Sequence, residues 1–343
     1  MPARERVPYF QSKKRVARLS LVALGLVACV ALALALFPNL RTTMAELQPA
    51  PRPAPIDGDR AYGYLKTICA IGPRPAGSEA NTRQRDMVAD HFKKHGAQVR
   101  EQPFQARDPL SGNAVSMVNL IGSWFPDRTE RVLISAHYDT RPYHDRDPDP
   151  KRAPFIGAND GASGVALLME MAHHMNDLPT PWGVDLVLLD GEELVYGTNA
   201  AIDDYFLGSK HFAKTYKSER RSPKNRSHYV AGFVLDMVGD RDLKIDQEQY
   251  SLELADRLVR EVWSVAQRLG ATSFKHQRGT AVYDDHLPLN DGGIPTIDLI
   301  DFDYPQWHTS QDLPEFCSGK SLAEVGRVLT GWLTMPKSRT RKK

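Results

Sequence analysis

The chain alternates short apolar runs with stretches that have helical periodicity, and this alternation constrains its fold more than any other feature. Runs typical of strands lie around residues 97–104, 115–122, 131–137, 184–189, 230–235 and 294–300. Helical patterns occupy residues 59–71, 78–95, 161–175, 209–216, 252–269 and 322–333. The helix at 78–95 has Ser78 or Asn81 as an N-cap candidate and Gly96 as its stop. This order predicts a three-layer α/β domain around a mostly parallel sheet.

The distribution of charge argues against a nucleic-acid partner. The 44 basic and 42 acidic residues give a net charge of +2. The segments 1–40 and 337–343 each carry +5, which leaves −8 for residues 59–336. A nucleic-acid-binding domain would instead show a basic footprint.

The cysteines also restrict the class of protein. Three cysteines are too few for a disulfide scaffold or a cysteine-built zinc finger. Cys69 and Cys317 could form one disulfide if the body is exported, and otherwise remain free thiols.

The N-terminal region predicts a membrane anchor. Residues 19–37 contain no charged side chain, and 19 helical residues span roughly the ~30 Å hydrocarbon core of a bilayer. The basic segment 1–18 should stay cytoplasmic, which places the body outside. A proline-rich linker at 38–58 separates the anchor from a catalytic domain at 59–336 and a basic tail at 337–343. Alternatively, the Ala33-Leu34-Ala35 motif marks a cleaved signal peptide and the body is secreted.

Carboxylate and imidazole side chains follow the predicted strands, at the sheet edge where open α/β folds place their sites. They are His137 to Asp139, Asp160, Glu192 with Glu193, Asp236 and His308. Imidazole and carboxylate are the ligands that zinc takes when no thiolate is available. Adjacent carboxylates in a buried crevice would be costly without a cation. The set therefore predicts a metal site, in which one glutamate of the pair holds metal and the other is a general base.

Six segments carry a resemblance to a known family: HYDTRP, GANDGASG, DGEELVYG, FVLDMVGD, YDDHLPL and PQWHTSQD. They resemble the zinc exopeptidase family that contains bacterial leucyl-type aminopeptidases and animal-type glutaminyl cyclases. The resemblance covers about residues 59–336. It implies a single catalytic domain with an α/β/α sandwich around a central mixed, mostly parallel sheet.

The resemblance also implies a role for individual residues. Asp160, Glu193 and His308 resemble the zinc ligands common to both branches of the family. Glu192 resembles the general acid/base, and Asp139 resembles a carboxylate that orients a neighbouring group. His137 and Asp236 resemble ligands of a second metal ion in the aminopeptidase branch, whereas cyclases typically hold one zinc.

Several features favour the cyclase branch. A long insert follows Glu193 and precedes a Gly-Ser-x-His segment. Asp285 lies in a segment that resembles the one that holds the substrate amide in cyclases. Trp307 precedes the predicted zinc histidine and could form one wall of a glutamine pocket. Two departures from the cyclase pattern call for the aminopeptidases as an alternative. The sequence of residues 160–164 is closer to that of the aminopeptidases. Cyclases also carry a pocket tryptophan shortly after the zinc glutamate, where this chain offers only Tyr196.

The resemblance therefore predicts a zinc-dependent glutaminyl-peptide cyclotransferase, an acyltransferase that converts the N-terminal Gln of peptides or proteins to pyroglutamate and releases ammonia. In this reading Asp236 and Asp285 orient the amide. The alternative is a zinc metallo-aminopeptidase that hydrolyses N-terminal residues with one or two metal ions. A further alternative is an inactive, membrane-tethered binding domain. The metal count, the natural substrate and the oligomeric state stay open at the level of the sequence.

Overall fold

The structure is a computed structural model that describes residues 50–147, 154–196, 204–222 and 226–336. The predicted anchor at 19–37 lies outside these residues, as do its basic flank, most of the linker and the C-terminal tail. Within the described ranges, no helix is both long and apolar enough to cross a bilayer.

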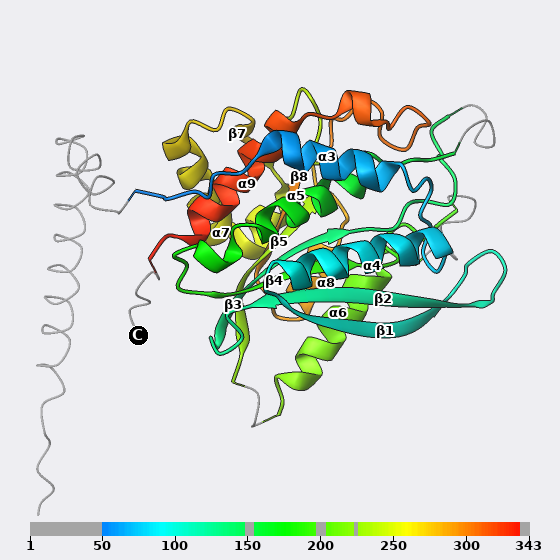
Figure 1. Cartoon of the computed structure of the whole chain (residues 1–343), viewed down its shortest axis with the longest axis horizontal. Helices are drawn as coiled ribbons and strands as arrows, with labels where there is room; N and C mark the ends of the chain where they lie inside the picture. The colour runs from blue at the N-terminus through cyan, green and yellow to red at the C-terminus, as the bar shows by residue number, and fades with distance from the viewer. Residues whose placement is uncertain (1–49, 148–153, 197–203, 223–225, 337–343) are drawn as a thin grey trace, which may run out of the picture. The chain divides into compact units, whose positions relative to one another are not determined.

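Six strands form one central sheet, in the order β1-β2-β4-β3-β5-β8 (Figure 1). Their bounds are β1 (Gln98–Arg107), β2 (Ala114–Trp124), β3 (Glu130–His137), β4 (Gly183–Leu189), β5 (His228–Asp236) and β8 (Thr296–Ile300). The last four are parallel to one another, while β2 pairs antiparallel with both β1 and β4. The sheet is therefore mixed and mostly parallel, as the sequence predicted.

Helices cover both faces of this sheet. They are α3 (Gly58–Cys69), α4 (Glu79–Lys94), α5 (Ala162–Ala172), α6 (Leu207–Glu219), α7 (Gln249–Leu269), α8 (His286–Asp291) and α9 (Gly319–Leu333), with short 3₁₀ turns at Met175–Asp177 and Pro314–Phe316. Helices α3, α4, α5, α7 and α9 share the larger core. Helices α6 and α8 share a smaller core on the other face. The three-layer prediction is therefore confirmed.

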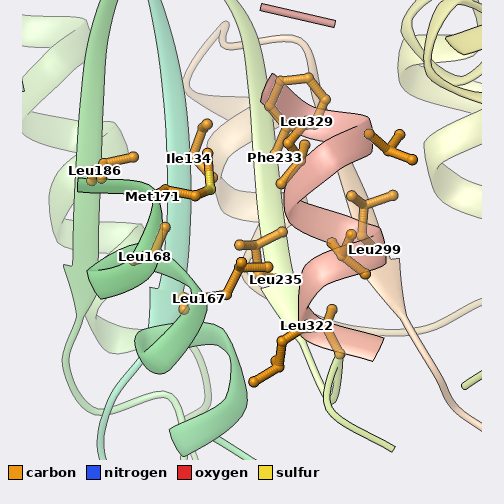
Figure 2. Packing of buried hydrophobic residues seen from close by; sticks show 14 of the residues in the cluster. Ile134, Leu167, Leu168, Met171, Leu186, Phe233, Leu235, Leu299, Leu322 and Leu329 are labelled. Atoms are coloured by element: carbon orange, nitrogen blue, oxygen red, sulfur yellow. The ribbon is translucent and has the colours of Figure 1, made fainter. Parts of the chain in front are cut away.

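Alternation along the strands separates the two cores. Ile134 belongs to the larger core, whereas its neighbour Leu133 belongs to the smaller one. Successive side chains of a strand point to opposite faces, so one strand supplies both layers. Figure 2 shows Phe233 and Leu235 of β5 between leucines of α5 and α9. This double burial explains why the central strands are rich in apolar residues.

The predicted elements occur within a few residues of their expected positions. Ser78 is the N-cap of α4, and its hydroxyl accepts the backbone N–H of Asn81 at 3.1 Å. Gly96 follows the helix with a φ of 86°, a conformation that favours glycine. The sequence did not predict the separate pair β6 (Ile245–Gln247) and β7 (Phe274–Arg278), nor the short helix α8.

Both cysteines of the body are free thiols. Cys69 and Cys317 are buried. Burial raises the pKa of the Cys69 thiol to about 12. A thiol with such a pKa is unreactive, so the two cysteines act here as packed apolar side chains.

Candidate metal centre

The carboxyl ends of the parallel strands bring the predicted site residues to one edge of the sheet. His137 is the last residue of β3, and Asp236 is the last residue of β5. Glu192 and Glu193 follow the end of β4. Asp160 lies just before α5, and His308 lies in the loop after β8. The prediction that strand ends would gather these residues is confirmed.

Asp160, Glu193 and His308 form the first candidate group of metal ligands. All three are buried, and one ligand atom from each lies within 4.8 Å of the other two. The Nε2 atom of His308 lies 3.4 Å from Oε1 of Glu193 and 3.6 Å from Oδ2 of Asp160. Among the described residues, Oδ2 of Asp160 has no hydrogen-bond partner. A buried carboxylate oxygen without a donor fits a cation at this position.

His137, Asp160 and Asp236 form a second candidate group, with ligand atoms again within 4.8 Å of one another. The Nε2 atom of His137 lies 3.2 Å from Oδ1 of Asp160 and 3.3 Å from Oδ1 of Asp236. Asp160 therefore directs one oxygen toward each histidine. A carboxylate between two ligand groups is the arrangement that a two-metal site requires.

Asp139 acts on the glutamates through their backbone. Its carboxylate accepts the N–H of Glu192 at 3.1 Å and the N–H of Glu193 at 3.0 Å. The same carboxylate lies 3.9 Å from Nδ1 of His137. These contacts fix the turn from which both glutamates project, which is a broader positioning role than the sequence predicted.

Glu192 and Glu193 have opposite pKa shifts. Burial, and then the neighbouring Glu193 carboxylate, raise the pKa of Glu192 well above its ordinary value. Burial acts in the same direction on Glu193, but Arg141 and His308 outweigh it and hold the pKa of Glu193 well below the ordinary value. One carboxyl can therefore carry a proton while its neighbour stays ionised, the division expected of an acid/base and a ligand.

Arg141 and Asp145 belong to the site, although no role was predicted for them from the sequence. The guanidinium of Arg141 donates to both oxygens of Glu193, at 2.5 and 3.1 Å. Asp145 lies 3.1 Å from Arg141 and 2.9 Å from Nδ1 of His308. An Asp on the remote nitrogen of a metal-binding histidine fixes its ring and raises its basicity. The one available signal was the position of Arg141 inside the HYDTRP segment.

Asp312 holds the backbone at Asp160 through hydrogen bonds. Its carboxylate accepts the backbone N–H of Asn159 at 2.8 Å and of Asp160 at 3.0 Å, and the hydroxyl of Tyr304 at 2.9 Å. Burial, and then the Asp160 carboxylate, raise the pKa of Asp312 to about 7. Asp312 ends the PQWHTSQD segment, but nothing in the sequence alone linked it to residue 160.

Asp285 lies at the site together with Asp284, for which no role was predicted from the sequence. The hydroxyl of Ser209 donates to Oδ1 of Asp285 at 2.5 Å. Asp284 is also buried, and the carboxylates of Asp284 and Asp285 add to the effect of burial in raising the pKa of Glu192. Burial, and then repulsion by Asp236, raise the pKa of Asp284 well above its ordinary value. The charges of both Asp284 and Asp285 therefore act on Glu192 of the candidate centre.

The two predicted pocket aromatics have different surroundings. The ring of Trp307 lies 4.2 Å from the ring of His308, centroid to centroid, and is half-buried. The guanidinium of Arg146 lies 4.0 Å above the Trp307 ring. Tyr196 donates its hydroxyl to Asp108 at 2.5 Å, so the β1–β2 hairpin holds it. A pocket role for Tyr196 stays a prediction.

Two of the four described non-glycine residues with a positive φ lie at the centre. His308 has a φ of 58°, and Met237, which follows Asp236, has a φ of 48°. Left-handed conformations are uncommon for residues other than glycine and persist where the surrounding structure enforces them. Gly161 has a φ of 89°, and a Cβ there would lie 2.9 Å from the Asp139 carbonyl oxygen. The chain next to Asp160 therefore needs glycine.

Comparison with known proteins agrees with this arrangement. A model of peptidase family M28 matches residues 119–333. The mouse glutaminyl-peptide cyclotransferase-like protein is 26% identical over 301 residues, which cover 81% of this chain and 76% of the mouse protein.

Solved structures include both branches of the family. Glutaminyl cyclase from Fimbriiglobus ruber superposes with a TM-score of 0.80 and 42% identity, over 83% of this chain and 97% of that chain. A leucine aminopeptidase precursor from Bacteroides thetaiotaomicron superposes with a TM-score of 0.75 and 31% identity, over 85% and 100%. The chain therefore belongs to peptidase family M28 and is an enzyme of that family, of the glutaminyl cyclase or zinc aminopeptidase kind.

Proposed function

We propose that the enzyme is a zinc-dependent glutaminyl-peptide cyclotransferase that acts on the N-terminal Gln of peptides or proteins. The observation that carries this proposal is the position of Trp307, whose ring lies 4.2 Å from that of the candidate ligand His308. A flat aromatic wall next to the reaction centre suits a planar side-chain amide. The 42% identity with a protein described as a glutaminyl cyclase gives independent support.

The ligand chemistry of the first group suits zinc. Asp160, Glu193 and His308 offer two carboxylates and one imidazole, and an open position for substrate is typical of catalytic zinc. When bound, the ion supplies Lewis-acid polarisation of the γ-carbonyl of the substrate Gln. Arg141 and Asp145 hold Glu193 and His308 in place through the contacts described above.

Glu192 carries the proton in the proposed reaction. It takes a proton from the α-amine as the amine attacks the carbonyl carbon of the side-chain amide, and then delivers it to the departing ammonia. A carboxyl with a raised pKa is suited to this exchange near neutral pH. Asp236 and Asp285 accept hydrogen bonds from the substrate amide, and Asp284 is an additional candidate for this role.

A panel of peptides tests the proposal. The full-length chain is incubated with peptides that begin with Gln, Leu or Ala and are otherwise identical. We expect ammonia from the Gln peptide, and no free amino acid from the other two. Trp307→Ala should slow cyclisation far more than it lowers zinc content. Rapid release of Leu or Ala with no ammonia would replace the proposal by the aminopeptidase reading.

The aminopeptidase remains the second candidate because His137, Asp160 and Asp236 form a further ligand group. In that reaction Glu192 takes a proton from the water that attacks the first peptide bond. Elemental analysis separates the two candidates: His137→Ala should lose one ion in an aminopeptidase and none in a cyclase. An inactive binding domain has no support from the site, since Glu192 and both ligand groups are intact.

We further propose that the catalytic domain is held outside the cytoplasmic membrane by residues 19–37. The proposal rests on the uncharged 19-residue span and the basic segment before it. A secreted domain, released by cleavage after Ala35, is the alternative.

A further inference from the structure

Three histidines gather away from the candidate centre. His91 and His95 lie one turn apart at the C-terminal end of α4, and His173 caps the C-terminal end of α5. One ligand atom from each ring lies within 4.8 Å of the other two, and all three residues are half-buried. Ring centroids are 4.0 Å apart for His95 and His173, 4.5 Å for His91 and His95, and 5.2 Å for His91 and His173.

This cluster is distinct from the candidate centre. Helix α5 begins directly after Asp160 and Gly161, and it has 11 residues. At ~1.5 Å per residue, its C-terminal end lies about 16 Å along the helix from that centre. Helices α3, α4 and α5 lie side by side on one face of the sheet (Figure 1). The histidines therefore stand where three helices meet, at the opposite end of α5.

The remote nitrogens of two rings are already fixed. Nε2 of His91 lies 2.8 Å from the carbonyl oxygen of Met169, which can only accept, so this nitrogen carries the proton and Nδ1 carries the lone pair. Nε2 of His173 shares a hydrogen bond of 2.6 Å with the hydroxyl of Tyr64. A carbonyl or hydroxyl on the far nitrogen is the usual support of a metal-binding imidazole.

The charges around the cluster are compatible with a cation. Arg60 is paired with Glu170 at 2.6 and 2.8 Å, and Glu170 also accepts from His174 at 3.0 Å. Burial lowers the pKa of all three imidazoles, and that of His173 to about 4, so each ring is neutral near pH 7. After burial, the charges of Lys94 and Arg60 also lower the pKa of His95, and the carboxylate of Glu170 opposes them. The C-terminal ends of α4 and α5 carry negative partial charge, which favours a cation there.

We propose that His91, His95 and His173 bind a divalent transition-metal ion, with zinc as the expected ion, and that this ion joins the ends of α4 and α5. Helical histidines at positions i and i+4 present both rings on one face, as in known zinc motifs. Bonds of ~2.0 Å in a tetrahedron place the ligand nitrogens about 3.4 Å apart, so small side-chain rotations close the site. The fourth position would hold water.

Metal stoichiometry tests the proposal. Full-length wild type and variants are equilibrated with zinc chloride, dialysed and measured by elemental analysis. His173→Gln and His95→Gln should each lose one equivalent of zinc and retain turnover. His211→Gln on α6 is the matched control, because it removes a half-buried helical imidazole that stacks on Phe104 instead of on other histidines. Equal zinc content in wild type and both cluster variants would overturn the proposal.

A second measurement does not depend on the folding of those variants. The double variant His137→Ala/His308→Ala removes a ligand from each group of the candidate catalytic centre but leaves the histidine cluster intact. Zinc should still raise the Tm of this double variant, and cobalt bound to it should give the visible absorption of a tetrahedral imidazole site. The absence of both effects in the double variant would contradict the proposal. A failure of peptide turnover in the wild type would bear on the catalytic proposal alone.

Discussion

Glu192 and Glu193 are adjacent in the chain and yet have opposite pKa shifts, because their side chains meet different neighbours. Glu193 contacts the guanidinium of Arg141 and the ring of His308, whereas Glu192 faces carboxylates. Asp139 holds both backbone N–H groups, so neither side chain can exchange places with the other. The division of labour between base and ligand therefore follows from the turn after β4.

Glu192→Gln tests the role of the base. The substitution keeps the size and polarity of the side chain and removes its capacity to take a proton. We expect kcat to fall by about 10²–10⁴-fold, the typical contribution of general acid/base catalysis, with zinc content unchanged. Steady-state kinetics and elemental analysis of the same preparation give the two numbers. Turnover close to that of the wild type would rule out this role.

Asp312→Asn tests a residue that acts through another. The carboxylate accepts two backbone N–H groups next to Asp160, and an amide cannot accept both with equal strength. We expect zinc affinity to fall by about 10–100-fold, as for other residues that hold metal ligands in place. Competition with a chelator measures the affinity.

Asp303→Asn is the control for this variant, because Asp303 is an exposed partner of Lys244. Its zinc affinity should equal that of the wild type. Equal affinities in all three proteins would show that Asp312 does not position the ligand.

At the scale of the elements, most of the sheet could be predicted from the sequence. Strands β3, β4, β5 and β8 are short apolar runs covered on both faces, and burial of that kind leaves a clear pattern. β7 reads FKHQR and buries only Phe274, so its pattern is too weak to predict a strand. Helix α8 has six residues, one of them proline, which is too short for helical periodicity.

The candidate site also contains residues that could be predicted from the sequence and residues that could not. His137, Glu193 and Asp236 could be predicted because parallel strands end at one edge, which the order of elements already implies. Contacts such as Asp145 with His308, 163 residues apart, depend on how two loops meet. The local sequence around either residue contains no signal for a contact over this distance along the chain. The supporting residues therefore emerge from the structure alone.

Glu248 gives helix α7 a stability that depends on pH. Its carboxylate caps the helix by accepting the N–H groups of Tyr250 and Ser251, at 2.8 and 2.5 Å. Burial acts against the charged form, but His286 and the backbone donors outweigh it and lower the pKa of Glu248 from 4.5 to about 2. A depressed carboxyl pKa stabilises the fold above about pH 4.5 and loses this effect as the pH falls towards 2.

Glu248→Gln should therefore lower the free energy of unfolding at pH 7 by about 1–2 kcal/mol, the upper part of the range for a helix cap. The difference from wild type should shrink as the pH is lowered from about 4.5. Urea denaturation at several pH values measures both effects. Glu253→Gln, on the exposed side of α7, should show neither. A difference that grows towards low pH would contradict the proposed cap.

At the scale of the whole molecule, the charge pattern suits the proposed enzyme, which would act on amino termini outside the cytoplasmic membrane. Residues 59–336 carry a net charge of −8, and carboxylates line the candidate centre. An acidic site attracts the cationic α-amine of a peptide. The basic segment before residue 19 would instead stay on the cytoplasmic side.

Protease protection tests the tether. Protease added to intact spheroplasts should digest the catalytic domain, and the protein should fractionate with membranes. A cytoplasmic protein of the same cells should survive the treatment. Recovery of a soluble form that begins at Leu36 would show cleavage after Ala35. Full protection from protease would contradict an exported domain.

The most direct test of the central claim uses one peptide that both candidate activities can attack. The full-length enzyme, loaded with zinc, is incubated with a short peptide that begins with Gln, and the products are followed by mass spectrometry. The cyclase reading predicts a product of the same length that has lost one ammonia, and Glu192→Gln should not form it. Release of free Gln, with a peptide one residue shorter, would contradict the claim.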